Sequence, residues 1–397
     1  MIDEGFLILY MLKKTLKYLH LWLGLLSGIL IFIIAITGCI YVFSEEIKEF
    51  THRDRNVIVA PLNTKKLPLS DLVNIAENIF EKKYTFQNII IPNFPNSSVS
   101  IIFEEIDEEG FWYPDYMVFN KTVYLNPYTG GIIKVENTKW EFFNVIFWIH
   151  ITLFMGYNST SSIIIISTIC VFLVMLISGI LLWWPNKKQR KQSFGFKWKK
   201  TTRWKRKNYD VHRIVGFYIF LFSLLIALTG LFWISDSFNK SVKWIANGGE
   251  HIIEKELPII KSINKPEDPL ETIYKKVIKD IPQSKYILIR KHPNETVPYI
   301  VRSYLNETIN YKRVEMYFDK SSATLISKEF FENKNNGEKI QALNYDLHVG
   351  SIGGFPTKII AFFVSLLIAS LPISGTLIWL GKKKVTKKNL NKLLVKN

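Results

Sequence analysis

The chain has 397 residues, of which 48% are hydrophobic, and its formal net charge is +17 at pH 7. The hydrophobic residues gather in long runs, which excludes a simple soluble domain and indicates an integral membrane protein. Both cysteines, Cys39 and Cys170, fall in such runs. The sequence therefore offers neither a disulfide framework nor a thiol site for zinc or an iron–sulfur cluster.

Four runs are long enough to cross a bilayer core, which takes about 20 residues of helix. They lack acidic residues and carry Lys or Arg only at their ends, and they cover residues 18–43, 160–184, 212–235 and 358–380. We therefore predict four transmembrane helices.

Two basic segments set the expected topology. Residues 186–208 hold eleven Lys and Arg with no acid, and the tail after Gly381 holds seven Lys. Both follow a membrane helix directly, which favours the positive-inside rule over a nucleic-acid patch. We expect both termini in the cytoplasm, no nucleic-acid partner, and a first helix that stays as an uncleaved anchor. Because residues 1–10 fit this scheme poorly, we hypothesise that translation starts at Met11; mass spectrometry of the mature N-terminus would test this.

The two long outer segments each predict a small α+β module. The first has a helix pattern at 68–84 and strand patterns at 88–92, 98–105, 115–120 and 122–135, the last of which indicates two strands around an Asn-Pro-Tyr-Thr-Gly-Gly turn. The second has a helix pattern at 266–281 and strand patterns at 286–290, 297–304 and 313–330.

The expected fold is thus an α-helical membrane protein with four transmembrane helices in two parallel repeats and two modules outside the membrane. The predicted membrane segments are 12–43, 141–185, 211–235 and 339–381, where the second and fourth include an interfacial stretch. The modules are expected at 44–140 and 236–338, and the basic loop and tail at 186–210 and 382–397.

A repeated pattern carries the strongest functional signal. Residues 20–38 read HLWLGLLSGILIFIIAITG, and residues 212–230 read HRIVGFYIFLFSLLIALTG. In each copy a histidine stands four residues before a glycine, at His20 with Gly24 and at His212 with Gly216. Two later segments, ending ISGILLWWP and ISGTLIWLG, each follow a further histidine, His150 and His348. Such self-similarity indicates an internal repeat.

These four histidines lie at predicted membrane edges, in two same-side pairs: His20 with His212 inside, and His150 with His348 outside. They could be interfacial residues that bond neighbouring helices, but their recurrence favours a ligand role. A zinc site takes four protein ligands, or three and a water, and each pair offers only two histidines. Haem iron needs only two axial ligands. The glycines near them fit close approach of a flat macrocycle or ordinary helix packing. The other histidines, His52, His251 and His292, are expected on the surface.

Two bis-histidine haems, one near each face, would form an electron path across the membrane. The sequence shows no dinucleotide, P-loop or flavin motif, so the electron donor would be another molecule, either a cytoplasmic reductase or a quinol. The basic loop could dock an acidic donor.

The pattern LHLWLG to IAITG, its second copy VHRIVG to IALTG, and the closing SGILLWW and SGTLIWL resemble the PepSY-associated transmembrane helix family, also called PiuB-like or iron-regulated membrane proteins. The segments WIH and DLH match its second histidine, and VYLNPYTGGII matches the end of a PepSY module. The second module, with YFDKSSATLIS, departs from that end by lacking its Pro and Gly.

The resemblance implies a bacterial inner-membrane protein with two haem b groups that reduces a ferric siderophore on the periplasmic side. It places the haem ligands at His20, His212, His150 and His348. A second reading is a membrane anchor whose PepSY modules bind a peptidase or envelope partner without catalysis. A third, a transporter, is disfavoured because the two halves run in parallel rather than inverted orientation.

Overall fold

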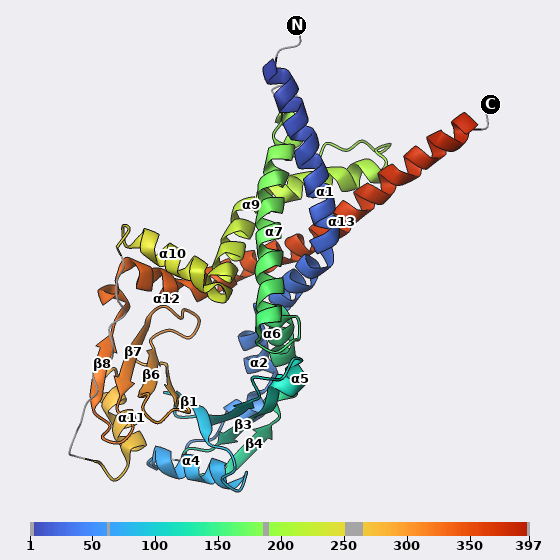
Figure 1. Cartoon of the computed structure of the whole chain (residues 1–397). Coiled ribbons are helices and arrows are strands. Elements are labelled where there is room, and N and C mark those ends of the chain that lie inside the picture. Colours follow the sequence, from blue (N-terminus) through green and yellow to red (C-terminus); the bar gives the residue numbers. More distant parts are fainter. Residues whose placement is uncertain (1–3, 62–63, 186–189, 251–264, 395–397) are drawn as a thin grey trace.

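The computed structural model describes residues 4–61, 64–185, 190–250 and 265–394. Four long helices form a bundle, and a domain built on a β-sheet lies at one end of it (Figure 1). Both ends of the chain lie at the opposite end of the bundle. The termini and the two basic segments therefore share one side, as the topology prediction requires of them.

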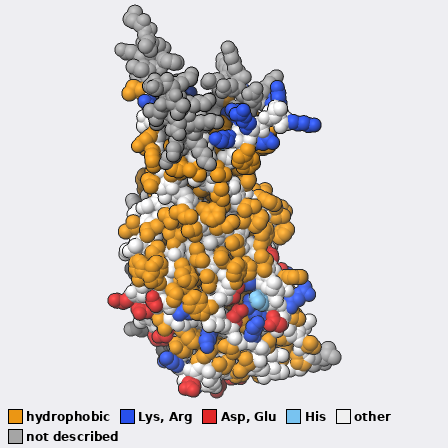
Figure 2. Space-filling view, turned by 90° about the vertical axis from the view of Figure 1, so that its right-hand side faces the viewer, with side chains coloured by type: hydrophobic (Ala, Val, Ile, Leu, Met, Phe, Trp, Pro, Cys, Tyr) orange, Lys and Arg blue, Asp and Glu red, His pale blue; other side chains and the backbone are white. Residues whose placement is uncertain are grey.

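The four long helices are α1 (Glu4–Tyr41), α7 (Ser159–Trp183), α9 (Trp204–Ile234) and α13 (Phe355–Leu394). Each contains a stretch apolar and long enough to cross a membrane, which confirms the four predicted spans. The helices α1, α9 and α13 extend beyond the predicted runs because hydropathy marks the apolar part of a helix but not the charged turns that continue it. Figure 2 shows the resulting apolar belt between a Lys- and Arg-rich end and an end that also carries acids.

Within the bundle, α1 packs on α13 and α7, and α9 packs on α13 and α7. A small core of Ile31, Ile219, Val364 and Ile368 lies between α1, α9 and α13. Apolar side chains therefore fill the middle of the bundle, between its two polar ends.

The domain outside the membrane contains a single eight-stranded antiparallel sheet of order β4-β3-β2-β1-β5-β6-β7-β8. Its strands are β1 (Phe86–Pro92), β2 (Val99–Ile106), β3 (Met117–Leu125), β4 (Ile132–Glu136), β5 (Tyr286–Arg290), β6 (Tyr299–Tyr304), β7 (Arg313–Phe318) and β8 (Leu325–Glu329). One face packs against α4 (Leu69–Asn78) and α11 (Pro269–Asp280) and forms the main hydrophobic core.

The two expected modules are joined, which the sequence did not predict. Strand β1 of the first pairs with β5 of the second, so that Ile89 lies opposite Ile289. Helices α4 and α11 meet beside this junction, where the Leu69 amide donates to the Glu271 carboxylate at 2.9 Å. The sequence of an apolar strand does not specify which of several similar strands it pairs with. The sequence pattern therefore predicted two separate modules.

One strand boundary was also wrong. The runs 115–120 and 122–135 were expected as separate segments, but the chain forms a short helix α5 (Tyr113–Tyr116) and then one strand, β3, which joins the first run to the start of the second. The end of the second run forms β4, the second of the two strands expected around its turn. The polar residues Asn120 and Lys121 do not interrupt β3 because it stays paired with β2 across them.

Short helices connect the sheet to the bundle, and two of them carry histidines. In α6 (Phe142–Thr152), the Asn144 side chain donates to the Tyr113 hydroxyl at 2.9 Å. In α12 (Asn336–Val349), the buried Asp346 carboxylate accepts the Tyr311 amide at 2.7 Å. Segments that join strands of the sheet thus fix both helices. The remaining short elements are α2 (Ser44–Thr51), α3 (Arg53–Asn56), η1 (Thr138–Trp140), α8 (Arg190–Ser193), α10 (Asp236–Ala246), η3 (Phe331–Asn333) and η4 (Ser351–Gly353).

Candidate functional site: two histidine pairs

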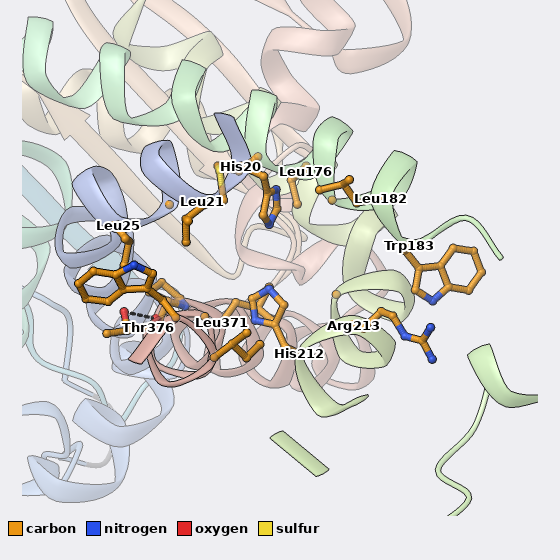
Figure 3. Close-up of a pocket in the computed structure, with 18 of the residues that line it drawn as sticks. His20, Leu21, Leu25, Leu176, Leu182, Trp183, His212, Arg213, Leu371 and Thr376 are labelled. Atoms are coloured by element: carbon orange, nitrogen blue, oxygen red, sulfur yellow. Dashed lines mark hydrogen bonds between the residues drawn. The ribbon is translucent and has the colours of Figure 1, made fainter. Parts of the chain in front are cut away.

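The first histidine pair, here called the pocket pair, consists of His20 on α1 and His212 on α9. Their ring centres lie 6.4 Å apart and the ring planes are nearly perpendicular, at 87°. Figure 3 shows the two rings facing each other across a pocket within the bundle. Two residues 192 positions apart in the sequence are therefore brought together, in the combination that the sequence predicted.

The second pair, here called the sheet-side pair, consists of His150 on α6 and His348 on α12. Their ring centres lie 6.1 Å apart with an interplanar angle of 56°. Trp233, at the end of α9, contacts His348 edge-on with ring centres 5.2 Å apart. This pair also matches the predicted combination.

The two pairs lie at opposite ends of the bundle. Thr37 of α1 lies 3.3 Å from Nδ1 of His150, and it is 17 residues beyond His20 on the same helix. At a rise of about 1.5 Å per residue, this places the pairs roughly 25 Å apart along the helix axis. That distance is close to the thickness of a bilayer core, which is about 30 Å.

Hydrogen bonds hold both rings of the pocket pair through the same nitrogen. Nδ1 of His20 lies 2.8 Å from the Ser178 hydroxyl on α7, and Nδ1 of His212 lies 2.8 Å from the Ser374 hydroxyl on α13. Because Nδ1 is used in each case, Nε2 is the nitrogen that remains for a ligand.

The sheet-side pair follows the same rule. Nδ1 of His150 lies 2.9 Å from the Ile34 carbonyl, and Nδ1 of His348 lies 2.9 Å from the Thr229 hydroxyl. In this pair, too, Nε2 is the nitrogen that remains for a ligand.

A cavity of about 440 Å³ surrounds the pocket pair, a volume within the usual range for small-molecule and cofactor sites. Gly24 and Gly216, both predicted as cofactor-binding residues, line it. A side chain added at Gly216 would enter open space, whereas one at Gly24 would meet the end of Met175 at 2.7 Å. The glycine on α9 therefore keeps space open beside His212.

The lining of this cavity is mainly apolar and includes basic residues. Its walls come largely from Leu, Ile, Phe, Met and Trp side chains, and Lys17, Arg213 and Lys382 also line it. Such a lining suits a flat apolar ligand that bears carboxylates.

The donor set limits the kind of metal group. Among the residues that the structure describes, no three His, Cys, Asp or Glu side chains come close enough together to hold a metal ion. A metal ion bound at about 2 Å by one nitrogen of each ring would hold two ring centres roughly 6 Å apart, as found in both pairs. The residues present therefore fit a metal whose other ligands come from the cofactor itself.

Two of the other histidines lie away from these pairs. His292 is exposed, and its Nδ1 accepts the Asn294 amide at 3.0 Å. His52 ends α2 and is partly exposed, while His251 lies outside the described residues.

The hydroxyl partners of the histidines were not predicted from the sequence. Ser178 and Ser374 precede the glycine of the ISG segments, and Thr37 and Thr229 precede the glycine of IAITG and IALTG. These hydroxyl residues therefore recur in the repeated motifs, in which the sequence prediction used only the glycines. A hydroxyl inside a helix usually bonds its own backbone, so its second role becomes visible only in three dimensions.

Comparison with known families gives one match. The model of a family described as "PepSY-associated TM region" matches residues 17–382, a span that includes both histidine pairs, all of α7 and α9, and most of α1 and α13. A search of curated proteins found no match to this chain.

Proposed function

The chain belongs to the family of the PepSY-associated TM region, and from this membership and its two histidine pairs we propose that it transfers electrons across a membrane. Each pair would hold one haem b, through Nε2 of His20 and His212 and through Nε2 of His150 and His348. Iron with two histidine ligands has no open position and exchanges one electron, which is the chemistry of electron transfer.

The observation that carries this proposal is the shared geometry of the four rings. In all four, Nδ1 is hydrogen-bonded and Nε2 is left over, and both ring separations suit one metal between two rings. Metal-binding histidines typically donate their second ring N–H to a protein acceptor. Interfacial histidines that only joined helices would have no reason to meet in pairs at this distance.

The surroundings support different tasks for the two ends. At the pocket pair, the walls are apolar, and the lining also includes Lys17 and Arg213, of which Arg213 pairs with Asp210 at 3.9 Å. At the sheet-side pair, the half-exposed Trp233 contacts His348 and lies between that ring and the surroundings. We therefore assign electron entry to the basic end and electron exit to the end that carries the sheet.

The proposed acceptor is a ferric siderophore or another ferric chelate, reduced to Fe(II) for iron uptake. The donor would be a cytoplasmic reductase or a quinol. The Lys- and Arg-rich end of Figure 2 supports a cytoplasmic position for both termini, which would make the sheet domain periplasmic in a bacterial inner membrane. We also interpret the two halves, each with its histidines and a four-stranded part of the sheet, as parallel repeats.

An absorption spectrum of the purified protein, oxidised and reduced with dithionite, tests the proposal. We expect sharp α and β bands on reduction and about two haems per chain. A colourless protein after expression with ample haem would refute it, and a non-catalytic role in binding a peptidase or envelope partner would then become the leading account.

A matched pair of variants tests the position of the pocket haem. Neither Gly216 nor Gly195 has an atom within 4 Å of where a side chain would begin, but only Gly216 lines the cavity. We expect Gly216→Leu to lose one haem of two and Gly195→Leu to keep both. Two haems in Gly216→Leu would remove the cavity from the proposal.

A further inference from the structure

Each of the four histidine rings packs against a hydroxyl residue and the glycine that follows it on another helix. These hydroxyl–glycine dipeptides are Ser178-Gly179 for His20, Ser374-Gly375 for His212, Thr37-Gly38 for His150 and Thr229-Gly230 for His348. The arrangement occurs at both ends of the bundle, with serine at the pocket pair and threonine at the sheet-side pair.

The glycines bring the backbone close to the rings. A Cβ added at Gly38 would lie 2.9 Å from Cε1 of His150, and one at Gly230 would lie 3.3 Å from Cε1 of His348. At the pocket pair the corresponding distances are 3.3 Å for Gly179 and 3.4 Å for Gly375. These values are below or at the limit of ordinary contact, so the rings occupy the space that a side chain would need.

Each hydroxyl also donates a hydrogen bond to a backbone carbonyl of its own helix. Ser374 Oγ donates to the Leu371 carbonyl at 3.0 Å, and Thr229 Oγ1 donates to the Leu225 carbonyl at 2.8 Å. A hydroxyl has a single proton to donate. While the hydroxyl donates to that carbonyl it accepts from Nδ1, and this arrangement puts the ring proton on Nδ1 and the lone pair on Nε2.

The same holds for the other two dipeptides. Ser178 Oγ donates to the Met175 carbonyl at 3.2 Å, and Thr37 Oγ1 donates to the Ile33 carbonyl at 2.7 Å. His150 adds an independent argument, because the Ile34 carbonyl beside its Nδ1 can accept but cannot donate. All four rings therefore share one tautomer.

We propose that the four hydroxyl–glycine dipeptides are the positioning residues of both sites: the hydroxyl fixes the tautomer, the glycine admits the ring, and together they present Nε2 to the iron. This inference rests on the proposed function, since it assigns a role toward the proposed haems. It also explains why α1 and α9 each carry a histidine at one end and a hydroxyl–glycine dipeptide at the other. The histidine of each helix belongs to the pocket pair, and its dipeptide positions a ring of the sheet-side pair.

Ser374→Ala tests the proposal, with Ser370→Ala as the matched control. Both serines lie on α13 and bond the carbonyl three residues before them, but only Ser374 contacts a histidine. We expect Ser374→Ala to lower the affinity of the pocket site for haem about 10- to 100-fold and to shift the midpoint potential of that haem to a more positive value. Its sheet-side haem should stay unchanged, which reports that the variant is folded.

Ser370→Ala should behave like the unmodified protein, and Ser374→Thr, which restores a hydroxyl, should recover most of the affinity. Thr229→Val should produce the corresponding loss at the sheet-side pair, with Thr168→Val as its control because Thr168 bonds only the carbonyl four residues before it.

The outcomes separate the two proposals. If the unmodified protein holds two haems and Ser374→Ala matches Ser370→Ala in haem affinity and potential, the inference is wrong and the proposed function stands. If the unmodified protein holds no haem, the proposed function is wrong and the inference falls with it.

Discussion

The two halves of the chain form equivalent structures, sometimes with the same residues at equivalent positions and sometimes with different ones. At the histidine pairs the residues are identical in type: Thr37 and Thr229 hold one pair, and Ser178 and Ser374 hold the other. In the sheet, equivalent positions carry different chemistry. Equivalent residues of the two halves are thus identical where they must form a hydrogen bond with a histidine ring or leave space for it. They differ where only the path of the backbone matters.

The turn between the last two strands of each half shows this relaxation. In the first half, the Gly130 amide donates to the Asn126 carbonyl at 2.9 Å, and in the second the Ala323 amide donates to the Asp319 carbonyl at 3.0 Å. Gly130 has φ +71° and Ala323 has φ +53°, so both occupy the left-handed region. The Asp319 carboxylate supports the second turn by accepting the Ser322 amide at 2.7 Å. The missing Pro and Gly therefore changed the residues of the turn but not its form.

The largest expected effect concerns the histidines, where the pocket pair and the sheet-side pair, each built from both halves, should be separable. We expect His212→Ala and His348→Ala each to retain one haem, because each removes a ligand from one pair only. Their reduced-minus-oxidised spectra should add up to that of the unmodified protein. The exposed His292 provides the control, since His292→Ala should retain two haems. Loss of both haems in one variant would contradict independent sites.

The second effect is an acid sensitivity at one sheet position of the second half, which the equivalent position of the first half lacks. Burial raises the pKa of the Glu315 carboxyl, but Arg313, Arg302 and Lys334 outweigh it and lower the pKa to about 2. Glu315 thus stabilises the folded domain above pH 4.5, and this contribution, on the order of 3 kcal/mol, is lost as the pH falls from 4.5 through about 2. The equivalent position in the first half is Thr122, which bonds Thr138 at 2.7 Å and does not titrate.

Glu315→Gln tests this difference. Thermal unfolding of the sheet domain should become less dependent on pH between 4.5 and 2, at the expense of stability at pH 7. Thr122→Val should lower stability by a similar amount at both pH values. An unchanged acid profile in Glu315→Gln would assign the sensitivity to other carboxyls.

The smallest effect distinguishes the two turns. Gly130→Ala should destabilise the sheet domain by about 1–2 kcal/mol, because it combines a left-handed backbone with a Cβ 2.6 Å from the Ile75 side chain. Ala323→Gly should change stability by less than about 1 kcal/mol, because relief of backbone strain offsets the loss of a buried methyl group. Denaturant unfolding of the two variants measures both changes in stability, and equal losses of stability would contradict this prediction.

The sequence predicted the parts of the molecule that follow from local pattern. Long apolar runs identified the four spans, and the recurrence of His20 and His212 identified residues that meet in space. The join between β1 and β5 and the hydroxyl partners of the histidines depend on which surfaces come together, and local pattern carries no information about that. Strand β3 was divided wrongly because Asn120 and Lys121 disfavour a strand in isolation, whereas pairing with β2 overrides that preference.

The shared sheet also has a consequence for how the protein is made. Strand β1 emerges with the first half, but its neighbour β5 follows only after α7 and α9 have been synthesised. Until then β1 is an edge strand with unpaired amides and carbonyls, which is a template for wrong pairing. During biosynthesis, β1 therefore stays unpaired on one side until β5 has been made. In this interval the nascent first half is prone to aggregation, and a chaperone would act on it. For the same reason, the two halves expressed as separate chains should assemble only when they are produced together.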